Sequence, residues 1–227
     1  MTTSEVALIV GAGRGLSAAF ARLCAAQGMQ VALAARDSSK LDALATEAKA
    51  RSYNCDASEE ADVKALFEAV EANLGVPDVV LYNPSYRIRG PLVELDAEGV
   101  KRGLMISAYG GFLVGQAAAR LMLERGSGSI LFTGASASVK GYPQSAPFAM
   151  GKFALRGLAQ SMARELAPKN IHVAHFVIDG GILAGEETGE DAQLHPEAIA
   201  ETYLHVHRQH RSAWTWEVEL RPWVERF

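Results

Sequence analysis

A glycine-rich segment near the N-terminus has the residue types of a phosphate-binding turn. It consists of Gly11, Ala12, Gly13, Arg14, Gly15, Leu16 and Ser17. Glycine permits positive φ angles and lets a ligand approach the backbone closely. Backbone N–H groups and the dipole of a following helix would face a diphosphate. We therefore predict a dinucleotide site here; the alternative is a tight turn without a ligand.

The residues after the next apolar run bear on which dinucleotide binds. Arg36 and Asp37 directly follow the predicted strand Gln30–Ala35. An acid at this place binds the adenosine ribose 2′-hydroxyl and favours NAD(H), whereas an arginine accommodates a 2′-phosphate and favours NADP(H). Arg14, in the glycine turn, would bring a second guanidinium to the same phosphate. We predict NADP(H), with NAD(H) as the alternative that Asp37 would support.

The elements that must position these residues alternate along the whole chain. Strands are predicted at Glu5–Val10, Gln30–Ala35, Arg51–Cys55, Pro77–Tyr82, Ser129–Thr133, Ile171–Ile178 and Ala213–Leu220. Helices are predicted at Gly15–Ala26, Ser38–Ala50, Ser58–Asn73, Ala97–Glu124, Pro147–Ala167 and Pro196–His207. Strands joined by crossover helices form a parallel sheet that is covered on both faces. We predict one α/β domain over residues 1–227, a doubly wound, mostly parallel seven-stranded sheet of Rossmann type.

Local signals refine these boundaries. Ser38 or Ser39 is a candidate cap of the second helix, Ser58 opens a capping box, and Gly75 is placed to stop the third helix. The segment Leu183–His195 follows the sixth strand, where loops that cover ligands lie in this architecture. Its short length predicts a modest lid and an open pocket.

The composition restricts the classes of partner. The 227 residues are 49% hydrophobic and 21% charged, with a net charge of -4, as in globular proteins. The mild acidity argues against nucleic acid, and no apolar run reaches the roughly 18 residues of a membrane span. The N-terminus lacks the pattern of a signal peptide. Cys24 and Cys55 are predicted to be buried and unpaired in a reducing cytoplasm.

Neither the histidines nor the tryptophans indicate a ligand site. His172 and His175 lie on the sixth predicted strand and are expected in the core. The other histidines are expected to be exposed and have no metal-ligand spacing, so no metal site is predicted; they are His195, His205, His207 and His210. The tryptophans are expected to pack the last strand and a subunit interface; they are Trp214, Trp216 and Trp223.

Several motifs, in order along nearly the whole chain, carry a family resemblance. The glycine turn resembles Gly-x-x-x-Gly-x-Gly with Ser17 in place of the last glycine, and Asp56 follows the third strand. Asn83 lies at the second position of a Tyr-Asn-Pro-Ser segment that resembles Asn-Asn-Ala-Gly. Together these resemble the short-chain dehydrogenase/reductase family. The resemblance implies that Asp56 approaches the adenine ring and that Asn83, Gly180 and Ile182 belong to the coenzyme site. It also implies a homodimer or homotetramer formed through the two long helices.

The resemblance fails at the residues that perform the family's chemistry. The family's Tyr-x-x-x-Lys is here Phe148 to Lys152, so the lysine is present and the phenol is absent. In the family the tyrosine transfers the substrate proton, and the lysine lowers its pKa and holds the nicotinamide ribose. Phenylalanine has no proton to transfer. Lys152 is predicted to bind the cofactor first, or to act on substrate directly or through water. The family's serine position falls on Ala135, and its helix asparagine position on Ser107.

Other residues are candidates to serve the substrate oxygen. Ser136 is next to the lost serine position and would donate a hydrogen bond, while Tyr142, in the loop before the helix, would supply a proton. A water molecule is a third possibility, and Asp179 after the sixth strand is a fourth. The leading hypothesis is an NADP(H)-dependent oxidoreductase of the short-chain type, acting on a small carbonyl or alcohol substrate with a non-standard catalytic site. The alternatives are a non-catalytic or regulatory NADP-binding protein and an enzyme of non-redox chemistry.

Overall fold

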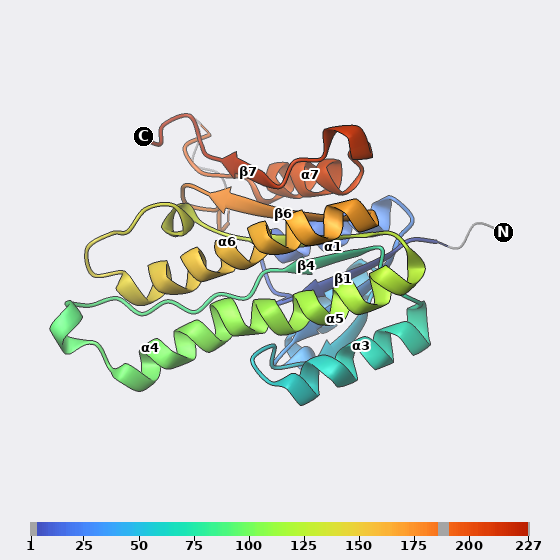
Figure 1. Ribbon diagram of the computed structural model, residues 1–227, viewed down its shortest axis with the longest axis horizontal. Helices are drawn as coiled ribbons and strands as arrows, with labels where there is room; N and C mark the ends of the chain where they lie inside the picture. Colours follow the sequence, from blue (N-terminus) through green and yellow to red (C-terminus); the bar gives the residue numbers. More distant parts are fainter. Residues whose placement is uncertain (1–3, 186–190, 227) are drawn as a thin grey trace.

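The computed structural model describes residues 4–185 and 191–226. At its centre lies one sheet (Figure 1), which has seven strands. The strand order is β3-β2-β1-β4-β5-β6-β7, and every adjacent pair is parallel. The strands are β1 Val6–Val10, β2 Gln30–Ala35, β3 Arg51–Asn54, β4 Val79–Tyr82, β5 Gly128–Thr133, β6 Ile171–Ile178 and β7 Glu217–Leu220. The predicted doubly wound Rossmann-type sheet is confirmed.

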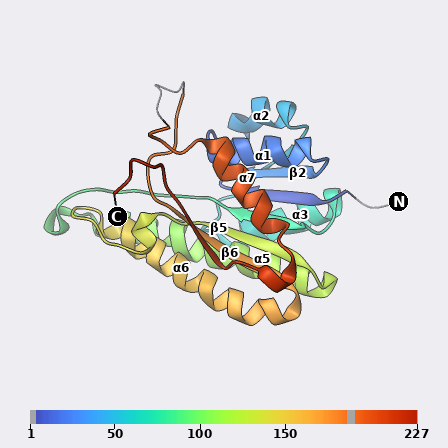
Figure 2. The same ribbon diagram turned by 90° about the horizontal axis from the view of Figure 1, so that it is seen from above.

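Helices cover both faces of this sheet (Figure 2). One face packs against α1 and α7, and the other against α3, α5 and α6. The helices are α1 Leu16–Ala26, α2 Asp42–Glu47, α3 Glu60–Leu74, α4 Ala97–Leu104, α5 Gly110–Arg125, α6 Ala146–Leu166 and α7 Pro196–His207. Strands β1, β4 and β6 are buried along their full length, because both of their faces are covered by helices. No helix in the described part of the chain is long and apolar enough to cross a membrane.

Two helix starts differ from the prediction because the serines expected as caps bond to residues outside the helices. Residues 38–41 form a short 3₁₀ turn, and α2 begins only at Asp42. Ser38 does not cap a helix with its side chain; its backbone N–H donates to Asn54 Oδ1 at 2.8 Å. The expected capping box is also wrong, since the Ser58 hydroxyl donates to Asp56 Oδ1 at 2.6 Å and α3 begins at Glu60. Gly75 ends α3 with φ +102°, as expected.

The predicted long helix over residues 97–124 is interrupted by a π-helical turn at Met105–Tyr109. The buried Tyr82 hydroxyl, which rises from β4, donates to the Ile106 carbonyl in this turn. A Cβ at Gly110 would lie 2.5 Å from the same hydroxyl oxygen. The helix therefore passes closely over Tyr82, and the π turn adjusts its path there. Strand β7 is also shorter than predicted, because residues 211–213 form a 3₁₀ turn.

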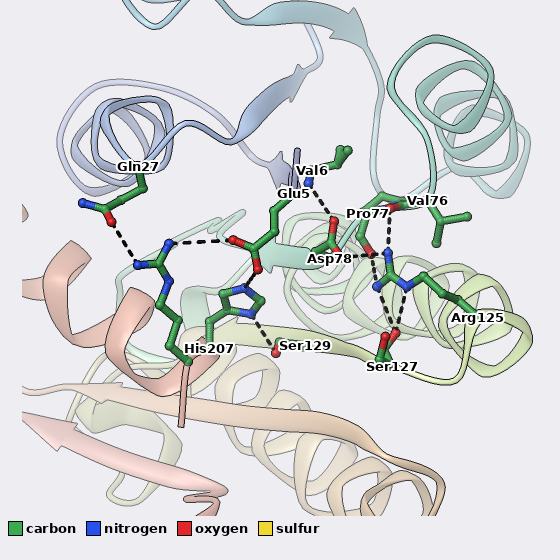
Figure 3. Close-up of polar contacts among 11 residues, drawn as sticks. Glu5, Val6, Gln27, Val76, Pro77, Asp78, Arg125, Ser127, Ser129 and His207 are labelled. Atoms are coloured by element: carbon green, nitrogen blue, oxygen red, sulfur yellow. Dashed lines mark hydrogen bonds and ion pairs between the residues drawn. The ribbon is translucent and has the colours of Figure 1, made fainter. Parts of the chain in front are cut away.

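Polar contacts link the elements at the amino ends of the strands (Figure 3). His207 at the end of α7 lies 2.9 Å from Ser129 Oγ through Nδ1 and 3.4 Å from the Glu5 carboxylate through Nε2. Its side chain is only 8% exposed, so the expectation that it is exposed is wrong. Asp78 accepts from the Val6 N–H at 2.7 Å and pairs with the Arg125 guanidinium at 3.1 Å. These contacts fix the strands at the end of the sheet opposite the predicted site.

The expectations for the buried cysteines and the strand histidines are confirmed. Cys24 and Cys55 are both free and buried. His172 and His175 are buried on β6, which lies next to the edge strand β7. Trp214 stacks on His172 with ring centroids 4.6 Å apart, so this tryptophan packs beside the last strand as predicted.

Candidate active site

A cavity of about 740 Å³ lies at the carboxyl ends of the central strands. Asn83 follows β4, Thr133 ends β5 and Asp179 follows β6, and all three line the cavity. This is the place where ligands bind in open α/β sheets. Eight of the candidate site residues line it: Asn83, Ser136, Tyr142, Phe148, Lys152, Asp179, Gly180 and Ile182. The glycine turn, Arg36 and Asp56 lie outside its wall and form a separate stretch of the predicted site.

The glycine turn has the backbone that its sequence predicts. Gly11 has φ +80° and Gly15 has φ +75°, conformations that side-chain-bearing residues rarely adopt. A Cβ at Gly11 would lie 2.6 Å from the Pro84 nitrogen, so this glycine lets two loops meet. By contrast, a Cβ at Gly13 would meet no protein atom within 4 Å. Packing does not explain the glycine at position 13, whereas close approach of a ligand would.

The hydroxyl at the family's last glycine position joins the turn to the cavity. Ser17 is buried in the first turn of α1, and its Oγ donates to the Gly11 carbonyl at 3.0 Å. Asn83 Nδ2 donates to Ser17 Oγ at 2.7 Å, and Asn83 also lines the cavity. Leu16 is buried beside Ser17 and anchors the start of the helix in the core. The turn and the cavity are thus held in a fixed relation.

The charged residues of the predicted adenosine region differ in whether their side chains already have protein partners. Asp37 is held by its own loop, because Ser39 Oγ donates to its carboxylate at 2.6 Å and Lys40 pairs with it at 3.1 Å. These contacts lower the pKa of Asp37. Among the described residues, neither Arg14 nor Arg36 forms a hydrogen bond or an ion pair with a defined partner atom. The two guanidinium groups therefore remain available, whereas the competing carboxylate is occupied.

Asp56, predicted near the adenine ring, is a fixed carboxylate. Its Oδ1 accepts from both the backbone N–H and the hydroxyl of Ser58, at 3.0 and 2.6 Å. Partial burial would raise the pKa of Asp56, but the Ser58 hydrogen bonds and the charge of Arg36 outweigh that effect and lower it. Asp56 is therefore ionised at neutral pH and oriented by its neighbour.

Among the cations that line the cavity, Lys152 is the one whose pKa is shifted most by burial. It is 2% exposed, and its Nζ donates to the Thr133 carbonyl at 2.8 Å. Burial lowers the pKa of Lys152 to about 8. Phe148 lies one helical turn before it, with the ring centroid 5.8 Å from Lys152 Nζ. No hydroxyl is carried on this ring, so Phe148 contributes shape and a π face to the cavity and no titratable proton.

The three serines near the expected catalytic positions have different environments. Ser136 lines the cavity from the short 3₁₀ turn at residues 136–138. Ser138 is fully buried, and its Oγ accepts from the Ala135 N–H at 3.1 Å, so it supports the turn. Ser107 is buried in the π-helical turn, and its Oγ has no hydrogen-bond partner among the described residues. Only Ser136 is placed to contact a molecule in the cavity.

The loop before α6 brings Tyr142 to the cavity beside an ion-pair cluster. Tyr142 lines the cavity and is 41% exposed, and Lys140 Nζ lies 5.8 Å from its ring centroid. Lys140 Nζ also pairs with the buried Asp179 carboxylate at 3.4 Å, and Arg221 approaches the same carboxylate at 3.7 Å. Asp179, considered as an unusual carboxylate near the substrate, is thus occupied by two cations.

The segment after β6 completes one wall of the cavity. Gly180 has φ +143°, and a Cβ there would lie 2.7 Å from Pro222 Cδ, so only glycine fits. Ile182 forms an isolated parallel bridge with Leu194. This bridge ties the two ends of the predicted lid, Leu183–His195, to each other. The middle of that segment, residues 186–190, lies outside the described residues.

The sequence reasoning missed two arginines that line the cavity, Arg87 and Arg89. Arg87 lies over the Phe148 ring, with its guanidinium carbon 4.9 Å from the ring centroid. The available signal was the pair of basic residues shortly after the fourth strand, in the loop that reaches the carboxyl edge of the sheet. Within residues 4–185 and 191–226, no group of three or more metal-ligating side chains occurs.

Comparison with known proteins settles the family. Residues 5–188 match the family model described as short chain dehydrogenase. The protein belongs to the short-chain dehydrogenase family. L-2,3-butanediol dehydrogenase of Corynebacterium glutamicum is 30% identical over 200 residues, which are 84% of this chain and 77% of that protein. D-threitol dehydrogenase of Mycolicibacterium smegmatis is 29% identical over 174 residues, which are 74% of this chain and 67% of that protein.

Solved structures of other family members have the same fold. A short-chain dehydrogenase from Rhodopseudomonas palustris superposes with a TM-score of 0.86 at 36% identity, covering 96% of this chain and 99% of that one. A metagenomic short-chain oxidoreductase in complex with NADP has a TM-score of 0.86 at 27% identity, covering 98% of this chain and 99% of that one. The family assignment therefore extends over the glycine turn, the cavity and Lys152.

Proposed function

We propose that the protein is an NADP(H)-dependent oxidoreductase of the short-chain type that acts on a small carbonyl or alcohol substrate through a non-standard catalytic site. The observation that carries this proposal is the open space over Gly13, in a turn linked by Ser17 and Asn83 to the cavity that holds Lys152. The named relatives dehydrogenate small alcohols, and one solved relative holds NADP, which supports the same assignment.

The residues present fit such a cofactor. The backbone around Gly13, Gly15 and Leu16 would hold the diphosphate, since no side chain fills that space. Arg14 and Arg36 would bind a 2′-phosphate, and the occupied Asp37 leaves the unphosphorylated cofactor without a carboxylate partner. Asp56 and Asn83, with Gly180 and Ile182, would border the adenine and nicotinamide ends. NADPH supplies a hydride when it is bound.

The remaining steps belong to the side chains of the cavity. Reduction of a carbonyl adds a hydride to carbon and a proton to oxygen. Ser136 would hold the oxygen, and Lys152 would hold the nicotinamide ribose through its Nζ. The proton would come from Tyr142 or from water, because Phe148 has none to give. With water as the donor, the site would be slower than one with a positioned phenol by about 10²–10⁴-fold, the contribution of a positioned acid.

The test is to restore the phenol with Phe148→Tyr. NADPH oxidation is measured against a panel of small ketones and aldehydes, and the substitution should raise kcat/KM by about tenfold or more. Phe153→Tyr is the matched control, because Phe153 lies on the same helix outside the cavity wall and is 44% exposed. A Phe148→Tyr variant that binds NADPH but shows no gain would contradict an otherwise intact reductase site.

The absence of the phenol also favours a second candidate, a non-catalytic or regulatory NADP-binding protein. The same geometry at the glycine turn would serve it, while the cavity would have lost its reaction. Tight NADPH binding by both the wild type and Phe148→Tyr, without turnover on any carbonyl of the panel, would select this candidate.

We further propose that residues 1–227 form one domain and that the protein is a homodimer or homotetramer built on α5 and α6. Large apolar side chains on these helices are about 40–50% exposed, as is typical of a covered surface; they are Phe112 41%, Leu123 40%, Met150 49% and Phe153 44%. A cytoplasmic location stays a prediction from the free, buried cysteines.

A further inference from the structure

One wall of the cavity carries two positive charges that the proposed reaction does not use. Arg87 and Arg89 both line it from the segment that follows β4. The segment is held in place, because the Gly90 N–H donates to the Gln144 carbonyl at 3.1 Å. The Arg87 guanidinium lies over the Phe148 ring at 4.9 Å from its centroid, a favourable cation–π distance. Arg87 is therefore held beside the cavity by the Phe148 ring, and Arg89, which is exposed to solvent like Arg87, lies on the same wall.

The two arginines have no counter-charge within the described residues. No carboxylate in that part of the chain lies within ion-pair distance of Arg87 or Arg89. Asp179, on the cavity wall, pairs with Lys140 at 3.4 Å and Arg221 at 3.7 Å. Partial burial and the neighbouring charge of Arg89 lower the pKa of Arg87. Two like charges side by side are unfavourable, and an anion between them would relieve the repulsion.

Other charges facing the cavity leave it positive. Lys152 adds a third cation to the wall. Glu225 is the carboxylate that remains without a partner in the ion pairs described, and it lies beside Gly180, toward the β6 side of the cavity. Asp179 is already neutralised by its two cations. The Arg87 side thus presents an uncompensated positive surface to any molecule bound there.

We propose that Arg87 and Arg89 bind an oxyanion group of the substrate, so that the substrate is an acidic carbonyl or alcohol compound. This proposal rests on the proposed function, since it specifies the substrate class of the same cavity. Guanidinium groups match the geometry of both carboxylates and phosphates through paired N–H donors. Arg87 and Ser136 line the same cavity of about 740 Å³, so a small molecule would present its anionic group to the arginines while its carbonyl oxygen faces Ser136.

Phe148 acquires a role in this arrangement. Its ring packs against the Arg87 guanidinium, at the position where the family carries its tyrosine. An aromatic ring at this position would therefore still serve anion binding even though the phenolic oxygen is absent. Phe148→Tyr would preserve this support, whereas Phe148→Leu would remove it.

The experiment measures binding to the protein saturated with NADP⁺, so that no turnover is required. Calorimetry compares 4-oxopentanoate with its methyl ester, and methyl phosphate with methanol. The oxyanion of at least one pair should bind with a Kd about tenfold lower than that of its neutral counterpart. Arg87→Gln should reduce this ratio of Kd values by about tenfold. A preference for 4-oxopentanoate assigns a carboxylate, and one for methyl phosphate assigns a phosphate ester.

Arg22→Gln is the matched control, because it removes the same charge from an exposed site on α1 that does not line the cavity. Arg89→Gln is a second variant if Arg87→Gln fails to fold, which circular dichroism reports. The proposal is overturned if neither oxyanion is preferred, or if Arg87→Gln and Arg22→Gln behave alike. Failure of NADP⁺ itself to bind would instead refute the proposed function.

Discussion

Gly11 and Gly13 lie two positions apart in one turn, yet a methyl group would act differently at each. At Gly11 it would meet the Pro84 nitrogen at 2.6 Å on a backbone with φ +80°. At Gly13 it would meet no protein atom within 4 Å. The fold therefore requires the glycine at position 11. It does not require the glycine at position 13, where a bound ligand would.

This difference gives a prediction at the residue scale. Gly13→Ala should leave the free energy of unfolding within about 0.5 kcal/mol of the wild type and weaken NADPH binding by about tenfold or more, since the methyl group fills ligand space. Gly11→Ala should cost about 2 kcal/mol or more of stability. Urea denaturation and calorimetry measure the two effects. Full NADPH affinity in Gly13→Ala would show that the diphosphate lies elsewhere.

Lys152 supports a second prediction at this scale. Its Nζ is buried and bonded to the Thr133 carbonyl, and its pKa is lowered to about 8 by burial. Lys152→Met keeps the length of the side chain but removes the donor, so NADPH binding should weaken by about tenfold, the loss of one charge-assisted hydrogen bond. The exposed Lys64→Met is the control. Equal affinities in the two variants would remove Lys152 from the cofactor site.

Single residues also show what sequence patterns could and could not reveal. The role proposed for Gly13 follows from the glycine-rich turn, whose spacing is fixed by the turn itself. The role proposed for Lys152 follows from its position one helical turn after Phe148. The occupation of Asp37 by Ser39 and Lys40 is a side-chain contact, which no spacing rule specifies. The position of Arg87 over Phe148 joins residues 61 positions apart, so it depended on the tertiary fold.

At the scale of elements, the strands were predictable because buried parallel strands are continuous apolar runs. Strands β2 and β6 match their predicted bounds residue for residue. The helix starts were less predictable, since the hydroxyls of Ser39 and Ser58 had loop partners that competed with capping. The π turn at Met105–Tyr109 depends on a hydroxyl from β4, which the local sequence does not contain.

The pairing of β6 with β7 yields a pH prediction. His175 Nδ1 lies 3.1 Å from Glu217 Oε2, and Arg156 binds the same carboxylate. Burial, only partly offset by Glu217, lowers the pKa of His175 to about 4. In the unfolded chain the histidine pKa is about 6.5, so below about pH 6.5 the unfolded chain binds more protons than the folded protein does. The His175 contribution to stability is present above pH 6.5 and is lost as the pH falls toward 4.

The expected size of this effect is about 2 kcal/mol between pH 7 and pH 5. Urea denaturation at the two pH values should show it in the wild type, and His175→Gln should show a smaller difference. Part of the slope will remain, because the pKa values of His172 and His207 are also lowered by burial. An unchanged pH dependence in His175→Gln would mean that His175 is not held neutral in the folded protein.

At the scale of the whole molecule, the exposed apolar side chains of α5 and α6 predict self-association. Phe153→Arg places a charge on this surface and should shift the protein toward monomer in size-exclusion chromatography with light scattering. Leu92→Arg is the control, because Leu92 is 74% exposed on the turn before α4. A monomeric wild type, or an unchanged oligomer in Phe153→Arg, would contradict assembly through these helices.

The central claim is that the glycine turn binds a dinucleotide whose 2′-phosphate is recognised by arginine. Calorimetric titration of the purified wild type with NADPH and with NADH tests it directly, with Arg36→Gln beside them. NADPH should bind at least about tenfold more tightly than NADH, and Arg36→Gln should abolish most of that difference. Failure of both cofactors to bind the folded protein would contradict the account, and tighter binding of NADH would contradict the role of the arginines.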